Sequence, residues 1–197
     1  MPRRRYEIDR DDKVIEMVSA AQRQLLDGGY GALSLAAIAR ELGIAQNSIY
    51  WYFPSRDHLF VAALRNLVAD FATRKPSSSD SVSERAVWIV NRLAEWHPLI
   101  AAMHERSRHS PTVAEFNGEV EAALRGMILR VLSPYVAEGE LDIAADAFWA
   151  GIEGALLRQL PRRRREAVVR YTLRQFIGDS AASESIRTLH ARGDATS

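Results

Sequence analysis

Apolar residues recur three and four positions apart along most of the chain, which is the spacing of an amphipathic α-helix. The first such stripe runs from Val14 to Leu25 and stops at Asp27-Gly28-Gly29, a helix-terminating run. Ser34 is well suited to cap the next helix, and Gly43 to end it. The pattern predicts further helices over residues 35–42, 46–52, from about 56, 82–96, 98–109, 112–132, 142–160 and 162–177.

No stretch alternates apolar and polar residues with the period of two expected of a strand, so an all-α fold is predicted. Residues 75–80 have the proline- and serine-rich composition of a linker, and Ser81 or Ser83 is suited to cap the helix that follows. Residues 178–197, which are rich in Ser, Ala, Asp and Gly, are predicted to form a flexible tail.

Residues 35–52 have the spacing of a helix-turn-helix. Two short helices that cross closely need a small residue at the crossing, and Ala39 supplies it. Gly43, four positions later, accepts the positive φ of a tight turn without penalty. Ile49, six positions after the glycine, is placed to bury itself against the first helix. In such a motif the second helix lies in the major groove of DNA.

If Ile49 faces inward, helical geometry places polar and aromatic residues on the outer side of the second helix. Amides pair with adenine edges, and hydroxyls bind bases or phosphates. Arg56 adds a cation beside the N-terminus of the next helix, where a phosphate is favoured. The residues predicted on or beside the outer face are Gln46, Asn47, Ser48, Trp51 and Tyr52, and the hydroxyls of Tyr50 and Tyr52 are offered to phosphate.

Residues 14–64 strongly resemble the DNA-binding region of the tetracycline-repressor (TetR) family of transcription regulators. The run from Gly43 to Arg56 resembles the family's recognition helix and the turn after it. The resemblance implies a DNA-binding domain over 1–55 and a helical ligand-binding and dimerisation domain over 56–177. It implies a homodimer, most readily a repressor, that leaves a palindromic operator when a small hydrophobic molecule binds. DNA contacts are expected from Ser34, Gln46, Asn47, Ser48, Tyr50, Trp51, Tyr52 and Arg56, with Ser34 and Arg56 at phosphates.

The same resemblance implies a ligand pocket and a dimer interface formed by the last two long helices. Aromatic and apolar residues of the C-terminal part are candidates for the pocket, although each is also a candidate for ordinary core. The pocket candidates are Trp88, Trp96, Met103, Phe116, Leu124, Met127, Phe148 and Ile152. The dimer candidates are Ala147, Gly151, Gly154, Leu157, Val168, Val169, Leu173 and Phe176, with packing inside one subunit as the alternative.

Composition excludes several other classes of protein. The chain has 197 residues, no Cys, and 26 Lys+Arg against 25 Asp+Glu, so a nucleic-acid site must be a local patch. Its polar N-terminus and the lack of a long apolar run predict a cytoplasmic protein without a membrane span. His104 and His109 are five residues apart, not the four of a zinc-protease helix, and no phosphate-binding or dinucleotide loop occurs. We therefore expect no enzyme, metal or cofactor.

A second hypothesis is a helical small-molecule-binding or interaction protein with a purely structural helix-turn-helix. The polar outer face at residues 46–48 favours the DNA-binding hypothesis. Two basic runs stay open. Arg3 to Arg5 could enter a minor groove of DNA, or they could belong to a solvated, disordered N-terminus. Arg162 to Arg165 could form a nucleic-acid patch or, more simply, a solvated first helical turn with acidic neighbours.

Overall fold

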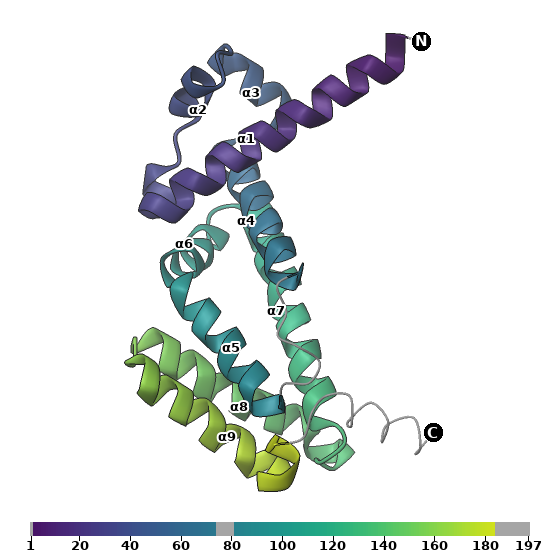
Figure 1. Ribbon diagram of the computed structural model, residues 1–197, viewed down its shortest axis with the longest axis vertical. Helices are drawn as coiled ribbons and strands as arrows, with labels where there is room; N and C mark the ends of the chain where they lie inside the picture. Colours follow the sequence, from purple (N-terminus) through teal and green to yellow (C-terminus); the bar gives the residue numbers. More distant parts are fainter. Residues whose placement is uncertain (1, 74–80, 184–197) are drawn as a thin grey trace. The chain divides into compact units, whose positions relative to one another are not determined.

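The computed structural model describes residues 2–73 and 81–183, and within these ranges the chain is all-α, as predicted (Figure 1). The chain divides into two compact units. Unit 1 comprises residues 1–75 and 98–117, and unit 2 comprises residues 76–97 and 118–197. The sequence-based division at residue 55 differs from this one, because the helix after Arg56 and a later segment pack with the N-terminal helices.

Unit 1 is built from the helices that surround the helix-turn-helix (Figure 1). These are α1 (Pro2–Ala32), α2 (Leu35–Glu41), α3 (Gln46–Tyr52), α4 (Arg56–Thr73), α6 (His97–Ser107) and the first residues of α7 (Pro111–Leu132). Regular helical geometry in α1 ends at Gly28 and Gly29. Gly29 has a φ of +67°, a left-handed conformation that is strained for residues with a side chain. The unit's core includes Met17, Leu25, Ile38, Ile49, Leu59, Phe60, Met103, Val113 and Phe116, all buried.

A buried carboxylate joins three of these helices. Asp57, in the first turn of α4, is 9% exposed. Arg106 of α6 donates to it twice, from Nε to Oδ1 at 3.2 Å and from Nη2 to Oδ2 at 2.7 Å. The hydroxyl of Tyr30, near the end of α1, donates to Oδ1 at 2.6 Å, and Ser110 adds a further hydrogen bond. One carboxylate thus holds α1, α4, α6 and the turn before α7 together.

Burial and hydrogen bonding act on the pKa of Asp57 in opposite directions. Burial alone raises the pKa, since it disfavours the charged form. Hydrogen bonds from Arg106, Tyr30 and Ser110 outweigh burial, so the pKa of Asp57 lies below its usual value. The pKa of the Tyr30 phenol is raised by burial and then by its bond to Asp57, which keeps the hydroxyl a donor.

Unit 2 packs four helices around its own core. They are α5 (Val82–Glu95), the part of α7 from Gly118, α8 (Leu141–Leu157) and α9 (Arg162–Ser183), with a short 3-10 helix, η1 (Glu138–Glu140), before α8. Ser81, one of the two residues predicted to cap this helix, forms a capping box with Glu84 at the start of α5. The core contains Val82, Val87, Val90, Leu132, Ala144, Ala145, Phe148, Ile152, Val169, Leu173 and Ile177.

The basic run at the start of α9 is partly internal to unit 2. Arg165 donates to the side-chain oxygen of Asn91 on α5, at 2.8 and 3.1 Å, and to the carbonyl of Leu160 at 3.1 Å. Arg162 pairs with Glu166 one turn on, and Glu166 also accepts from Asn91 at 2.8 Å. Arg165 therefore joins α9 to α5, and Arg162 stabilises the first turns of α9. The pairing of Arg162 with Glu166 agrees with the prediction that acidic neighbours meet some of this charge.

The ends of the chain are described only in part. The predicted tail begins where α9 loses helical geometry, at Gly178 with a φ of +75°, and residues 184–197 lie outside the described residues. The predicted linker at 75–80 also lies outside them, as do the side chains of Arg3 to Arg5. None of the described helices combines the length and apolar character needed to cross a membrane.

Replacement of Asp57 is expected to destabilise unit 1. Asp57→Asn leaves the Arg106 guanidinium without its buried counter-charge, at a cost of about 3 kcal/mol near pH 7. A carboxylate with a lowered folded-state pKa stabilises the fold above the unfolded pKa of about 4, and this contribution disappears as the pH falls through the folded pKa. Urea unfolding followed by circular dichroism should therefore show a variant-to-wild-type difference that shrinks between pH 7 and pH 3.

Asp27→Asn, a change at an exposed carboxylate of α1, is the matched control and should alter stability little at either pH. A loss for Asp57→Asn that is the same at both pH values would contradict the role given to its charge.

Candidate nucleic-acid interface

The turn between α2 and α3 has the geometry predicted for a helix-turn-helix. Gly43 has a φ of +65°. Its amide donates to the carbonyl of Arg40 at 3.3 Å, and the amide of Ile44 donates to that of Ala39 at 3.0 Å, a Schellman closure of α2. Ala39 and Ile49 are buried, at 3% and 0% exposure, so α3 packs on α2 through the two predicted residues.

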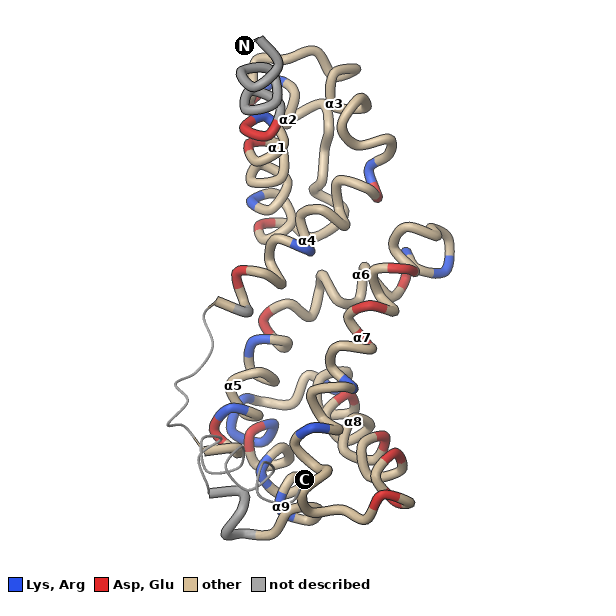
Figure 2. The backbone as a smooth tube through the Cα atoms, turned by 90° about the vertical axis from the view of Figure 1, so that its right-hand side faces the viewer, with Lys and Arg blue, Asp and Glu red and all other residues tan. Residues whose placement is uncertain are grey.

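The outer face of α3 presents amides and rings to solvent. Trp51 is 87% exposed, Tyr50 is 45% exposed, and Gln46 and Asn47 are exposed as well. Ser48 and Tyr52 are half-buried beside this face. No residue of α3 is charged, and its tube is tan in Figure 2. An indole left in water over almost its whole surface contributes little to the fold, so its presence here favours a contact with another molecule.

Ser34 and Arg56, the two expected phosphate contacts, both have partners within unit 1. The Ser34 hydroxyl accepts from the amide of Ala37 at 3.2 Å and caps α2, as predicted. The Arg56 guanidinium donates to the carbonyls of Tyr30 and, at 3.2 Å, Gly31, and lies 4.2 Å from the centre of the Tyr30 ring. Arg56 therefore fastens the start of α4 to the turn between α1 and α2.

Arg40 is a cation that the sequence analysis did not single out. It lies in the last turn of α2, where its charge suits the helix C-terminus, and it is exposed. Its outward position could have been predicted from the sequence. Arg40 follows the buried Ile38 by two positions, which places it on the opposite side of α2. It is the exposed cation nearest in sequence to α3.

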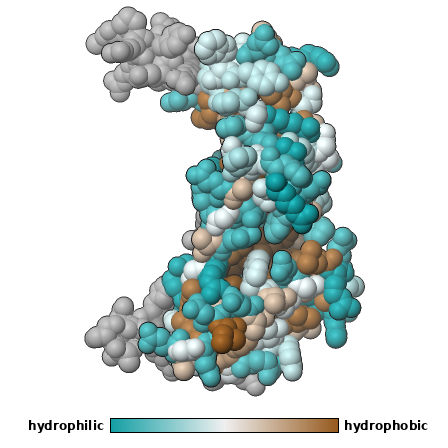
Figure 3. All heavy atoms as spheres, turned by 180° about the vertical axis from the view of Figure 1, so that it is seen from behind, coloured by the Kyte–Doolittle hydropathy of each residue, from teal (hydrophilic) through white to brown (hydrophobic). Residues whose placement is uncertain are grey.

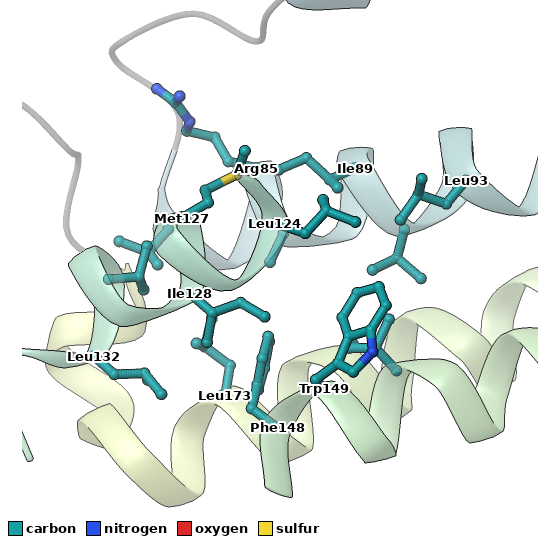
Figure 4. Close-up of a pocket in the computed structure, with 15 residues that line it drawn as sticks. Arg85, Ile89, Leu93, Leu124, Met127, Ile128, Leu132, Phe148, Trp149 and Leu173 are labelled. Atoms are coloured by element: carbon teal, nitrogen blue, oxygen red, sulfur yellow. The ribbon is translucent and has the colours of Figure 1, made fainter. Parts of the chain in front are cut away.

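Unit 2 contains an apolar cavity between α5, α7, α8 and α9 (Figure 4). Its volume is about 110 Å³, and fourteen of its fifteen lining residues are apolar. The remaining one, Arg85, directs its guanidinium away from the apolar side chains. Such a cavity favours an apolar guest and, at this volume, accommodates one close to benzene in size.

The cavity brings together half of the residues proposed for the ligand pocket. Leu124, Met127, Phe148 and Ile152 line it. Trp88 and Trp96 belong to α5 or its C-terminal cap but are not among its lining residues. Met103 and Phe116 are buried in unit 1, where the Arg65 guanidinium lies 4.9 Å from the centre of the Phe116 ring. Helical periodicity identified these two as buried but not the core to which they belong.

The residues proposed for a dimer interface separate into two groups. Val169 and Leu173 are fully buried in the core of unit 2, and Phe176 packs against Phe148. These three side chains therefore make their contacts within one chain. Ala147 and Leu157 are exposed on α8, while Gly151, Gly154 and Val168 are half-buried. Exposed apolar residues on α8 and α9 also include Ile143 and Tyr171, and apolar atoms interrupt the hydrophilic surface of unit 2 in Figure 3.

The described part of the chain offers no cluster of metal-ligating side chains. Among those residues, no group of three or more His, Cys, Asp or Glu side chains could hold a metal ion. His104 and His109, weighed above as a metal pair, lie near the end of α6 and beyond it.

The fold and the exposed face of α3 are those of a helix-turn-helix protein, a class in which the second helix typically lies in the major groove of DNA. Residues 17–63 match the family model described as bacterial regulatory proteins, tetR family. HTH-type transcriptional regulator Rv1816 of Mycobacterium tuberculosis is 31% identical over 144 residues, which cover 66% of this chain and 60% of that protein. HTH-type transcriptional regulator Mb1846 of Mycobacterium bovis gives the same identity and coverage, so the chain spans about 60% of the length of both relatives.

Solved structures share the fold at low sequence identity. A transcriptional regulator of Rhodococcus sp. RHA1 superposes with a TM-score of 0.67 at 18% identity, covering 83% of this chain and 95% of that one. The multidrug binding protein EbrR, solved with proflavin, gives a TM-score of 0.54 at 20% identity, covering 80% of this chain and 97% of that one. Residues 17–63 are therefore similar in sequence to the DNA-binding region of the tetR family, and the chain has the fold of solved regulators of that family.

Trp51→Ala is expected to weaken binding to a specific DNA fragment without destabilising the protein. Loss of a contact at the groove costs about 1–3 kcal/mol of binding free energy. Stability should change by less than about 0.5 kcal/mol, because the side chain is almost wholly in water. Fluorescence anisotropy with a labelled fragment and thermal unfolding measure the two effects.

Leu26→Ala, an exposed apolar position on α1, is the control and should leave DNA affinity unchanged. A Trp51→Ala variant that loses stability but keeps its DNA affinity would favour a structural helix-turn-helix.

Arg56→Ala is expected to lower stability while leaving the salt dependence of DNA binding unchanged, because its guanidinium is already bound to backbone carbonyls. Removal of a true phosphate contact lowers the slope of log affinity against log salt by about one. Arg40→Ala provides the comparison and should lower the slope by about that amount. The measurement is DNA affinity at four or five salt concentrations. A reduced slope of log affinity against log salt for Arg56→Ala would indicate that Arg56 contacts a phosphate after all.

Proposed function

We propose that the protein is a homodimeric repressor in the cytoplasm that binds a palindromic operator and leaves it when a small hydrophobic molecule enters unit 2. The observation that carries the DNA-binding part is the exposed, uncharged face of α3 over a fully buried Ile49. Side-chain amides and hydroxyls at residues 46–48 suit base edges, and the nearby ring of Trp51 suits a sugar or base.

The homodimer is supported by apolar side chains that unit 2 leaves in water. Ile143 and Leu157, at 72% and 69% exposure, lie fourteen residues apart on α8, four helical turns that return to one face. Ala147 and Gly154 lie on the same face and would let a second helix approach closely. Tyr171 of α9 is exposed as well. A two-fold dimer through this face would present two copies of α3 to DNA.

The response to a ligand is supported by the apolar cavity and by one structural relative. EbrR was solved with proflavin, which establishes ligand binding in that protein. For this chain, an effector acts only if it binds one of two arrangements of the dimer more tightly than the other. Filling the cavity is expected to favour the arrangement that binds the operator less well.

Selection of DNA fragments by the purified full-length protein, near physiological salt, tests the proposal. A palindrome with half-sites centred about one helical turn apart, or a whole multiple of it, is the expected result. Leu157→Glu places a charge on the dimer face, so this variant is expected to run as a monomer in gel filtration and to lose the palindrome.

Leu26→Glu, at an exposed apolar position on α1, is the matched charge control and should stay dimeric. If a folded, dimeric wild-type protein selects no sequence, the second hypothesis of a helical ligand-binding or interaction protein replaces this one.

A further inference from the structure

A second hollow lies beside the apolar cavity, between α7 and α8 of unit 2. Its volume is about 310 Å³, and its walls include the charged residues Glu121, Arg125 and Asp146. Leu124, Ile128 and Trp149 line both this outer hollow and the inner cavity. These three side chains therefore separate an apolar chamber from a polar one.

Trp149 is the largest side chain of this partition and, like Leu124 and Ile128, is only half-buried. It projects from α8 beside Phe148, with its indole among the side chains that line the inner cavity (Figure 4). The residue is half-buried, whereas its neighbour Phe148 and Ile152 one turn on are buried in the core. A change of rotamer at Trp149 would join the two chambers without displacing the core. The joined space reaches the range of about 300–1,000 Å³ typical of ligand sites, which the inner cavity alone does not.

The outer hollow has an excess of negative charge. Arg125 of α7 donates to Asp142, at 2.6 Å, and to Asp146, both on α8. Glu121 lines the same hollow, so three carboxylates, including Asp142 beside it, stand against the one guanidinium of Arg125. Figure 2 shows the acidic residues gathered along the start of α8. A cation is attracted to such a site and an anion is repelled, while the face of the Trp149 indole adds a further attraction for a cation.

We propose that the effector is an amphipathic organic cation, whose apolar part passes Trp149 into the inner cavity while its cationic head stays in the outer hollow beside Glu121 and Asp146. The inference rests on the proposed function and names the ligand class of its effector site. The inner walls exclude water from the apolar part. Because the carboxylates of Asp142 and Asp146 are largely exposed, salt screens the charge selectivity.

Three probes with one chain length and different head groups test the charge selectivity. The probes are n-octyltrimethylammonium, 1-octanol and octanoate, titrated calorimetrically into the full-length protein below the concentrations at which they form micelles. The ammonium is expected to bind about tenfold more tightly than octanoate at low salt, with the ratio falling as salt is added. Glu121→Gln combined with Asp146→Asn should bring the ratio close to one. Glu138→Gln, at an exposed carboxylate of η1 that lines neither chamber, should leave it unchanged.

Trp149→Ala tests the partition. The variant is expected to bind N-phenyl-1-naphthylamine, a neutral probe larger than the inner cavity, at least several-fold more tightly than the wild type does, as measured by probe fluorescence. Trp88→Ala removes an indole from α5 that lines neither chamber and should leave binding of this probe unchanged. An unchanged affinity in Trp149→Ala would show that the indole does not separate the chambers.

Tighter binding of octanoate than of the ammonium would overturn the proposal and would point to Arg125, the cation of the outer hollow, as the partner of an anionic head. Failure of all three probes to bind, in a protein that still selects an operator, would overturn this inference and leave the DNA-binding proposal in place. Binding of the ammonium with the expected selectivity, in a protein that selects no DNA, would support this inference and overturn the proposed function.

Discussion

The carboxylate of Asp57 is the group on which the DNA-binding unit depends. A charge with so little exposure is tolerated only when nearly every lone pair is satisfied, and three side chains from separate segments do this. Asp57 follows α3 by only five residues, so its donors fix the first turn of α4 directly after the turn that ends α3. A displacement of the α6–α7 turn that removed Arg106 or Ser110 would leave the charge unsatisfied. The turn before α7 is therefore held to α4 within unit 1, whereas residues of α7 from Leu124 onward line the cavity of unit 2.

Local spacing was enough to predict the helix-turn-helix. Ala39, Gly43 and Ile49 lie within eleven residues, a span over which helical geometry leaves little freedom. Arg56 shows where local reasoning ends. Its charge and its place at a helix start favour a phosphate, but its partners are two backbone carbonyls some 25 residues earlier, and carbonyls have no signature in a sequence.

The sequence also did not predict how the apolar residues are distributed between the cores of unit 1 and unit 2. Periodicity shows which face of a helix is buried, but it does not show what covers that face. Met103 and Phe116 were for this reason proposed for the ligand pocket, although they complete the core of unit 1. Val169 and Leu173 were assigned to a dimer, although α9 buries one face against its own subunit and exposes Tyr171 on another. Half of the aromatic and apolar residues proposed for the pocket line the cavity, whose walls are mostly aliphatic.

If the protein is the regulator proposed above, the lack of charge on α3 has a consequence for how it searches a genome. Lysines and arginines hold a regulator to any stretch of DNA, because the phosphates are the same everywhere. A recognition helix of amides, hydroxyls and rings gains little from a wrong sequence and gains its full contacts only at the right one. Such a protein spends less of its time on the far more numerous decoy sites, so a small number of copies per cell suffices to keep an operator occupied.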